Sequence, residues 1–177
     1  MTAPVLRAQD VAFELVLPTM PHLQNAVGEG VKSWPVQPRI IVGEKEKRAA
    51  FRIAHAAFVK SGTSTLELAL AGVPMVAAYK GGTIEAWIMR SMIQSNSAIL
   101  ANLVIGENVV PEFIQQDCRP EKLLPALRDV LDDSPLRRRQ LEAFAKIAAI
   151  MSTGNQSPSA RAADIVLATL RKARRPN

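Results

Sequence analysis

The 177-residue chain has few of the residues that build disulfides, metal centres or base-stacking surfaces. It contains one cysteine, Cys118, so no disulfide can form within the chain, and we expect a cytoplasmic protein. Two histidines, His22 and His55, are too few and too widely spaced to make a structural zinc site with that cysteine. Aromatic residues make up 5% of the chain and no nucleic-acid-binding motif is visible, which argues against nucleic acid as a partner.

Long hydrophobic runs are also missing. No apolar stretch approaches the ~18 residues that a membrane-spanning helix needs, and the N-terminus lacks a basic region followed by a long apolar one. Hydrophobic residues nevertheless make up 48% of the chain, enough to bury a sizeable core. The composition therefore predicts one compact globular domain.

The charge is positive and unevenly placed. The formal net charge is +6, and basic residues gather at Arg137–Arg139 and Arg171–Arg175. Such clusters are typical of solvated helix faces and of a basic chain end. An anionic membrane surface is the other interpretation, because each Lys or Arg near acidic lipid gains about 1 kcal/mol.

Apolar runs of strand length alternate with amphipathic stretches over the first hundred residues. The predicted strands are Phe13–Leu17 (ended by Pro18), Arg39–Val42, Ala57–Lys60, Met75–Tyr79 and Ser97–Leu100. The predicted helices between them are Pro21–Glu29 (stopped by Gly30), Glu44–Ala56 (with Ala50, Phe51, Ile53 and Ala54 toward the sheet), Thr63–Ala71 and Thr83–Ile93. This order predicts an α/β fold with one mainly parallel, Rossmann-like sheet of about five or six strands, and ligands at the carboxyl ends of the strands.

The chain beyond Pro120 is predicted to be helical. The expected helices are Pro120–Leu131, Pro135–Met151 and a last helix from Ser157–Pro158 to about Arg174. The last two open with a serine followed by proline, a combination favoured at the N-cap and first helical position. The polar segment 152–156 between them is a plausible hinge.

The stretch Ser61–Lys80 carries the clearest chemical signal. A strand ends at Lys60, Ser61 and Gly62 form a turn, and Thr63 begins a helix that Gly72 ends. Free backbone N–H groups at such a helix N-terminus suit a phosphate. Glu67 lies about one turn inside the helix, within reach of a ligand's neutral hydroxyls. The alternative reading is an ordinary helix cap followed by a solvated carboxylate.

Two strings make the first reading more specific. S-G-T-x-T-L-E-x-x-L-A-G-V-P-M-V-x-x-Y-K, from Ser61, resembles the donor-nucleotide half of the lipid-A-disaccharide synthases, glycosyltransferases of family 19 with two Rossmann-like domains (GT-B). A second string, Ile99–Leu103 with Gly106-Glu107, Val110–Phe113, Gln116–Cys118 and Pro120–Leu123, resembles the same family further on. The resemblance covers roughly Phe13 to Leu170 and leaves residues 1–12 as a non-matching or disordered N-terminus. It implies a Rossmann-like UDP-sugar-binding domain over residues 13–133 and C-terminal helices over 134–177.

The resemblance implies both a site and a reaction. UDP would contact Ser61, Gly62, Thr63, Glu67 and Asn102. Glu67 would accept hydrogen bonds from the ribose hydroxyls, while Asn102 would face the diphosphate or the ribose; on the residues alone, Asn102 is equally a turn-capping asparagine. The implied reaction transfers 2,3-diacylglucosamine from UDP to 2,3-diacylglucosamine 1-phosphate, with inversion to a β-1,6 linkage and release of UDP, in lipid A biosynthesis. No metal or other cofactor is expected.

Part of the family pattern has no counterpart here. The family's N-terminal domain, with its acceptor site and proposed catalytic base, is not seen, nor is the Pro-Gly-Ser-Arg loop that opens its second domain. We therefore expect a truncated donor-binding half that is inactive alone and has no catalytic residue of its own. The alternatives are a fragment of another UDP-sugar enzyme of the same fold, such as the lipid II N-acetylglucosaminyl transferase or an epimerase, and a nucleotide-binding or inert remnant. A homodimer joined through the C-terminal helices is also expected. A second expectation is a peripheral position of the chain at the inner face of the inner membrane.

Overall fold

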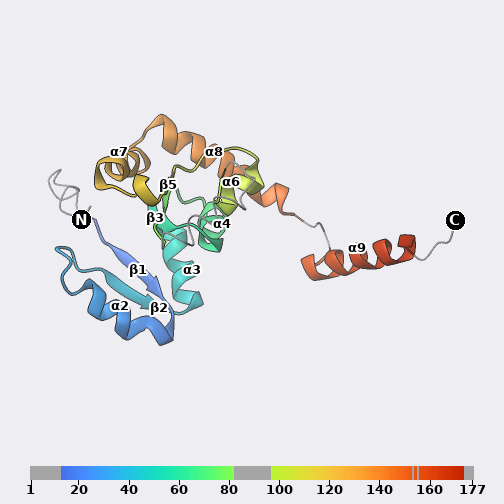
Figure 1. The fold of residues 1–177 in the computed structure, drawn as a ribbon, viewed down its shortest axis with the longest axis horizontal. Coiled ribbons are helices and arrows are strands. Elements are labelled where there is room, and N and C mark those ends of the chain that lie inside the picture. The colour runs from blue at the N-terminus through green and yellow to red at the C-terminus, as the bar shows by residue number, and fades with distance from the viewer. Residues whose placement is uncertain (1–12, 82–96, 153, 155, 174–177) are drawn as a thin grey trace.

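The computed structural model describes residues 13–81, 97–152, 154 and 156–173 (Figure 1). The strands are β1 (Val16–Thr19), β2 (Arg39–Val42), β3 (Ala57–Lys60), β4 (Met75–Tyr79) and β5 (Glu112–Ile114). The α-helices are α2 (Gln24–Val31), α3 (Glu44–Ile53), α4 (Thr63–Leu70), α6 (Leu100–Ile105), α7 (Pro120–Leu131), α8 (Pro135–Ile150) and α9 (Pro158–Ala173). Two short 3-10 helices are η1 (Pro21–Leu23) and η2 (Gln115–Asp117).

Each strand pair in the described part of the chain is parallel, which confirms the predicted α/β fold with parallel strands and flanking helices. The strands form two sheets where one was predicted. β1 pairs with β2, and β4 lies between β3 and β5. We call these the two-stranded sheet and the three-stranded sheet.

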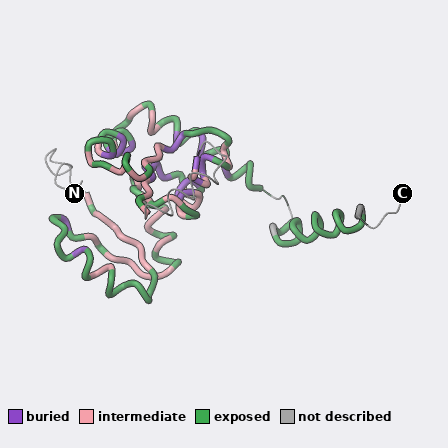
Figure 2. Tube along the Cα trace, in the orientation of Figure 1, coloured by how far each residue is buried: buried purple, intermediate pink, exposed green. Residues whose placement is uncertain are grey.

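The core is built around β4. Met75 and Ala77 pack with α4, α6 and α8, in a cluster that includes Phe144 and Ile147. Val76 points to the other face, since side chains alternate along a strand, and packs with Leu123, Ala126, Leu127 and Val130 of α7. The three-stranded sheet therefore has a helical layer on each face, and Figure 2 shows the buried residues gathered there.

Several predicted elements are confirmed with the same first and last residues. The strands Arg39–Val42, Ala57–Lys60 and Met75–Tyr79 are β2, β3 and β4, and the helix Pro120–Leu131 is α7. Ser134 caps α8, because its Oγ accepts a hydrogen bond from the Arg137 N–H at 3.0 Å. Ser157 caps α9 in the same way through the Ala160 N–H. The serine–proline pairs thus set both helix starts.

The prediction that Pro18 ends the first strand was wrong. Pro18 lies inside β1, which begins at Val16 and ends at Thr19. Arg39 donates to the Leu15 carbonyl and Gly43 to the Thr19 carbonyl, so the alternate groups of β1 face β2 and Pro18 faces the open edge. A proline on that edge removes no ladder hydrogen bond.

Two predicted helix ends were also wrong. α2 continues past Gly30 to Val31, whose side chain is buried and holds the last turn in place; packing here outweighs the low helix propensity of glycine. α3 ends at Ile53, because Ala54 adopts an extended conformation. Phe51 and Ala54 pack on the core as predicted, but Ile53 is 79% exposed and is not part of that core.

The predicted strand Ser97–Leu100 does not form, and β5 was not predicted. Leu100 begins α6, while the backbone before it is held by the Glu112 carboxylate of β5, which accepts from the Ala98 N–H at 3.1 Å and from the Ser97 hydroxyl at 3.1 Å. The Glu112 side chain here takes the place of the backbone hydrogen bonds that a strand would have made. The predicted helix Thr83–Ile93 lies outside the described residues.

α9 stands apart from the rest of the described chain, at the right of Figure 1. Its apolar side chains Ile165, Val166, Leu167 and Leu170 are all exposed. α8, in contrast, contributes Gln140, Ala143, Phe144 and Ile147 to the buried interior. The two C-terminal helices therefore play different parts in the fold.

Candidate nucleotide-binding site

The turn between β3 and α4 has the geometry of an anion-binding helix start. Gly62 has φ +154° and ψ −164°, a backbone region that is essentially restricted to glycine. It precedes Thr63, the first residue of α4, and both residues are exposed. The first N–H groups of a helix have no intrahelical partner. Gly62 therefore lets the chain turn so that these N–H groups open toward solvent at the carboxyl end of β3.

Two hydroxyl groups fix this turn. The Thr65 hydroxyl, fully buried, donates to the Gly62 carbonyl at 2.7 Å. The Ser61 hydroxyl donates to the Ala98 carbonyl at 2.9 Å and so ties the turn to the segment before α6. The Ser61 N–H donates to Ala78 of the neighbouring strand. The Ser61 side chain is thus a support of the turn, and its hydroxyl proton is already used.

Glu67 lies on the same helix, one turn further on. Its side chain is 38% exposed, and its Oε2 lies 2.8 Å from the Nζ of Lys47 in α3. Lys47 also contacts Glu44 Oε1 at 3.0 Å. These hydrogen bonds, with Glu67 first and Glu44 second, raise the pKa of Lys47 above its ordinary value. The ammonium therefore stays charged at neutral pH and holds the Glu67 carboxylate.

Lys47 was not singled out from the sequence. A weak signal was present, because β2 is followed by Gly43 and the start of α3 just as β3 is followed by Gly62 and the start of α4. Both helices begin at carboxyl ends of parallel strands, which is where ligands of such sheets bind. Lys47 is the fourth residue of its helix and Glu67 the fifth of its own. Only the packing of the two helices shows that their side chains meet.

Asn102 does not join this surface. It lies in α6, not in a loop, and its side chain is 2% exposed. Its Nδ2 donates to Ser97 Oγ and to the Val110 carbonyl, and its Oδ1 accepts from the N–H groups of Val109 and Val110. An amide has two donor hydrogens and two acceptor lone pairs, so all four are used. This geometry argues against a direct contact with a nucleotide.

Asn102 is still connected to the turn. α4 and α6 pack together on the same face of the three-stranded sheet. The Asn102 amide donates a hydrogen bond to the Ser97 hydroxyl oxygen. The Glu112 carboxylate accepts hydrogen bonds from the Ser97 hydroxyl and the Ala98 N–H. The Ala98 carbonyl in turn accepts a hydrogen bond from the Ser61 hydroxyl. The structure thus groups Ser61, Gly62, Thr63 and Glu67 around the start of α4 and places Asn102 behind them as a support.

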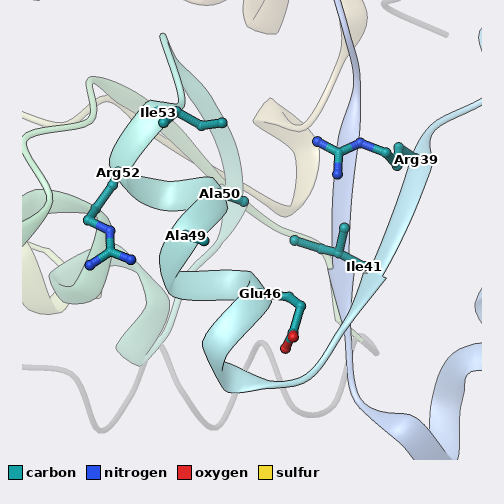
Figure 3. A pocket seen from close by; sticks show the side chains of 7 residues that line it. All are labelled: Arg39, Ile41, Glu46, Ala49, Ala50, Arg52 and Ile53. Carbon is teal, nitrogen blue, oxygen red and sulfur yellow. The ribbon is translucent and has the colours of Figure 1, made fainter.

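A shallow hollow lies elsewhere, between α3 and β2 (Figure 3). Ala50 and Ile53 of α3 point across it toward Ile41 and Arg39 of β2, and Glu46, Ala49 and Arg52 complete its lining. None of the five predicted site residues lines it. Among the residues that the structure describes, no three His, Cys, Asp or Glu side chains gather as a metal ion would require. None of the described helices has both the length and the hydropathy needed to cross a bilayer.

Comparisons with known proteins agree on one family. A sequence model described as lipid-A-disaccharide synthetase matches residues 2–166. The lipid-A-disaccharide synthase of Bradyrhizobium diazoefficiens is 68% identical over 170 residues, 96% of this chain and 43% of the relative. Those of Rhodopseudomonas palustris strain HaA2 (66% identical, 94% and 42% covered) and Gluconobacter oxydans (36% identical, 92% and 39% covered) match similarly. The chain thus spans less than half the length of the curated relatives it matches, and it belongs to the lipid-A-disaccharide synthase family.

Proposed function

We propose that this chain binds the nucleotide of a UDP-sugar, as the donor half of a lipid-A-disaccharide synthase. The observation that carries the proposal is the start of α4. There an exposed helix N-terminus, shaped by Gly62, lies one turn from a carboxylate held by Lys47. N–H groups suit a diphosphate, and a carboxylate accepts hydrogen bonds from ribose hydroxyls. The family match over residues 2–166 supports uridine as the base.

The whole reaction would transfer 2,3-diacylglucosamine from UDP to 2,3-diacylglucosamine 1-phosphate, with inversion to a β-1,6 linkage. In this chain the residues around α4 hold the leaving UDP. The helix N-terminus offsets the diphosphate charge, so we propose no metal or other cofactor. The base that activates the acceptor hydroxyl belongs to the other half of the enzyme. Preorganised donors each contribute roughly 10²–10³ in rate, so a half site is expected to be inactive alone.

Titration calorimetry with UDP tests the proposal. The chain should bind UDP and release no product from the donor sugar. Glu67→Ala should weaken UDP binding by about 1–3 kcal/mol, the usual loss for a hydrogen bond to a charged group. Glu142→Ala, an exposed carboxylate on α8, is the matched control and should leave the affinity unchanged. Equal affinity in wild type and Glu67→Ala would remove Glu67 from the site, and no binding at all would favour an inert remnant.

We also propose that α9 pairs two copies of the chain. Its row of exposed apolar side chains, Ile165, Val166, Leu167 and Leu170, has the character of a surface that is covered in an assembly. Exchange of a terminal helix between two chains is a low-cost route to a homodimer. Light scattering should report a dimer that Leu167→Glu dissociates. A monomer across the micromolar range would refute the pairing.

The same helix carries Arg161 and Arg171, both exposed. We propose that these cations attract the chain to an anionic membrane, consistent with a place at the inner face of the inner membrane where acylated sugars are made. Sedimentation with vesicles containing about 30% phosphatidylglycerol should recover the chain in the pellet, and salt should release it, because surface attraction is screened. Equal recovery with neutral vesicles would rule out the electrostatic term.

A further inference from the structure

Lys47 holds two carboxylates from two different helices. Its Nζ lies 2.8 Å from Glu67 Oε2 in α4 and 3.0 Å from Glu44 Oε1 in α3. The lysine side chain is 19% exposed, while those of Glu67 and Glu44 are 38% and 54% exposed. The cation is therefore the inner member of the group, and the two carboxylates are the outer members.

Each carboxylate uses one oxygen for the lysine. Neither carboxylate has a hydrogen-bond or ion-pair partner other than Lys47 among the described residues. The two bonded oxygens cannot lie farther apart than the sum of their distances to Nζ, since both contact that one nitrogen. The shared ammonium also offsets the repulsion between two like charges. Lys47 thus keeps two partly exposed carboxylates close together.

We propose that Lys47 is a positioning residue that holds Glu67 and Glu44 as a joint acceptor for a vicinal diol, the 2′- and 3′-hydroxyls of the nucleotide ribose. Two neighbouring hydroxyls donate two hydrogen bonds, and two neighbouring, partly exposed carboxylates can accept them. The diphosphate site at Gly62 and Thr63 lies one helical turn away, as a 5′-diphosphate requires. This inference rests on the proposed function and adds selection of ribose over 2′-deoxyribose.

The alternative role of the Lys47–Glu67 ion pair is to fasten α3 to α4 and nothing more. The two roles differ in which measured quantity a substitution at Lys47 changes. A link would change stability and leave selectivity between sugars untouched. A diol acceptor would change the ratio of affinities for UDP and 2′-deoxy-UDP, because the deoxy analogue leaves one acceptor without its donor.

The test is titration calorimetry of the full chain with UDP and with 2′-deoxy-UDP. Wild type should bind UDP about tenfold or more tightly than the deoxy analogue, as loss of one hydrogen bond to a charged group predicts. Lys47→Met should bring that ratio close to one, and Lys47→Arg should keep most of it. Lys45→Met, an exposed lysine on the same helix, is the control and should keep it fully. Glu44→Gln should lower the ratio without removing the lysine, which covers the case in which Lys47→Met does not fold.

The outcomes separate the two proposals. Equal affinity of wild type for UDP and 2′-deoxy-UDP, or an unchanged ratio in Lys47→Met, would overturn the diol acceptor and leave UDP binding intact. Binding of ADP and UDP with equal affinity, both preferred over their deoxy forms, would overturn the uridine assignment and support the diol acceptor. Failure of wild type to bind any of these nucleotides would overturn both.

Discussion

The central strand β4 of the three-stranded sheet and the two strands of the two-stranded sheet share the same parallel pairing, yet they are buried very differently. In the three-stranded sheet, Met75, Val76 and Ala77 of β4 are fully buried. In the two-stranded sheet, each residue of β1 is only partly buried. β4 has α7 on one face and α4 with its neighbours on the other, whereas β1 and β2 are contacted by α2 and α3. Apolar strand sequence therefore does not ensure burial; β4 is buried because it lies between two strands and has helices packed on both of its faces.

The proposed site lies where these two regions meet. α3 packs on β1 and β2, α4 packs on β3 and β4, and Lys47 joins the two helices through Glu67. Phe51 and Ala54 carry the end of α3 onto the core of the three-stranded sheet. The less buried region thus supplies Lys47 and Glu44, while the well-packed region supplies the Gly62 turn and Glu67.

Isoleucine-to-alanine substitutions in three places should give the largest differences in stability. Ile147→Ala removes a fully buried side chain beneath the three-stranded sheet and should lower the free energy of unfolding by about 3–4 kcal/mol. Ile41→Ala, half-buried in β2, should lower it by about 1 kcal/mol, and Ile53→Ala, 79% exposed, by less than about 0.5 kcal/mol. Urea denaturation of the three variants gives the order. An effect at Ile41 as large as that at Ile147 would show that the two sheets are equally packed.

Asn102 should be the most sensitive polar residue of the three-stranded region. Asn102→Ala leaves the N–H groups of Val109 and Val110 without their acceptor in a buried place, so we expect a loss of about 2–3 kcal/mol. Asn25→Ala, at an exposed position of α2, is the control and should change stability by less than about 0.5 kcal/mol. Thermal denaturation checks both. Should Asn102→Ala bind UDP more weakly while keeping wild-type stability, direct contact with the ligand would be supported instead.

Amide hydrogen exchange measures the local stability of the two sheets without any substitution. The Ala77 N–H donates to Pro111 at 3.0 Å inside the three-stranded sheet, and the Arg39 N–H donates to Leu15 at 2.8 Å inside the two-stranded sheet. The two hydrogen bonds have similar lengths, but β4 is more deeply buried than β1 and β2. Arg39 should exchange through local opening with a free energy at least about 1 kcal/mol below that of Ala77. Equal protection of the two amides would mean that both sheets open only in global unfolding.

The smallest effect concerns the link between the regions. The pKa of Lys47 is raised above its ordinary 10.5 by Glu67 first and then by Glu44, so folding is favoured by the charged form. This contribution is complete below the unfolded-state pKa and is lost as pH rises through the higher folded-state pKa. The free energy of unfolding of the wild type should be higher than that of Lys47→Met by less than about 1 kcal/mol at pH 7 to 9, because the ion pairs of Lys47 are partly exposed. Urea denaturation at pH 7, 9 and 11 should show the difference shrinking only at the highest pH.

Local signals in the sequence were sufficient for several parts of the fold. The strand bounds of β2, β3 and β4, the serine caps of α8 and α9, and the turn at Gly62 all depend on residues within a few positions of one another. Where a distant contact intervened, prediction failed. β5 was missed because it is short, and its Glu112 side chain takes the place of a strand ladder at Ala98.

The candidate site divides in the same way. Ser61, Gly62, Thr63 and Glu67 are close in sequence, and their order alone placed them at one helix start. Whether Asn102 faced a ligand or the interior depended on the 107–110 segment folding back over it, and the structure places its amide inside. Lys47 is twenty positions from Glu67, so nothing local joins them.

The family, the parallel α/β class and the glycine turn before α4 could be predicted from the residues alone, because motif spacing, apolar periodicity and backbone preference are properties of short segments. The folded chain was needed to show that the strands form two sheets, that Asn102 is a buried support, and that Lys47 joins two carboxylates. Those facts depend on which helices cover which faces. Such cover is set by the packing of side chains far apart in the chain, whose free energy no short segment contains.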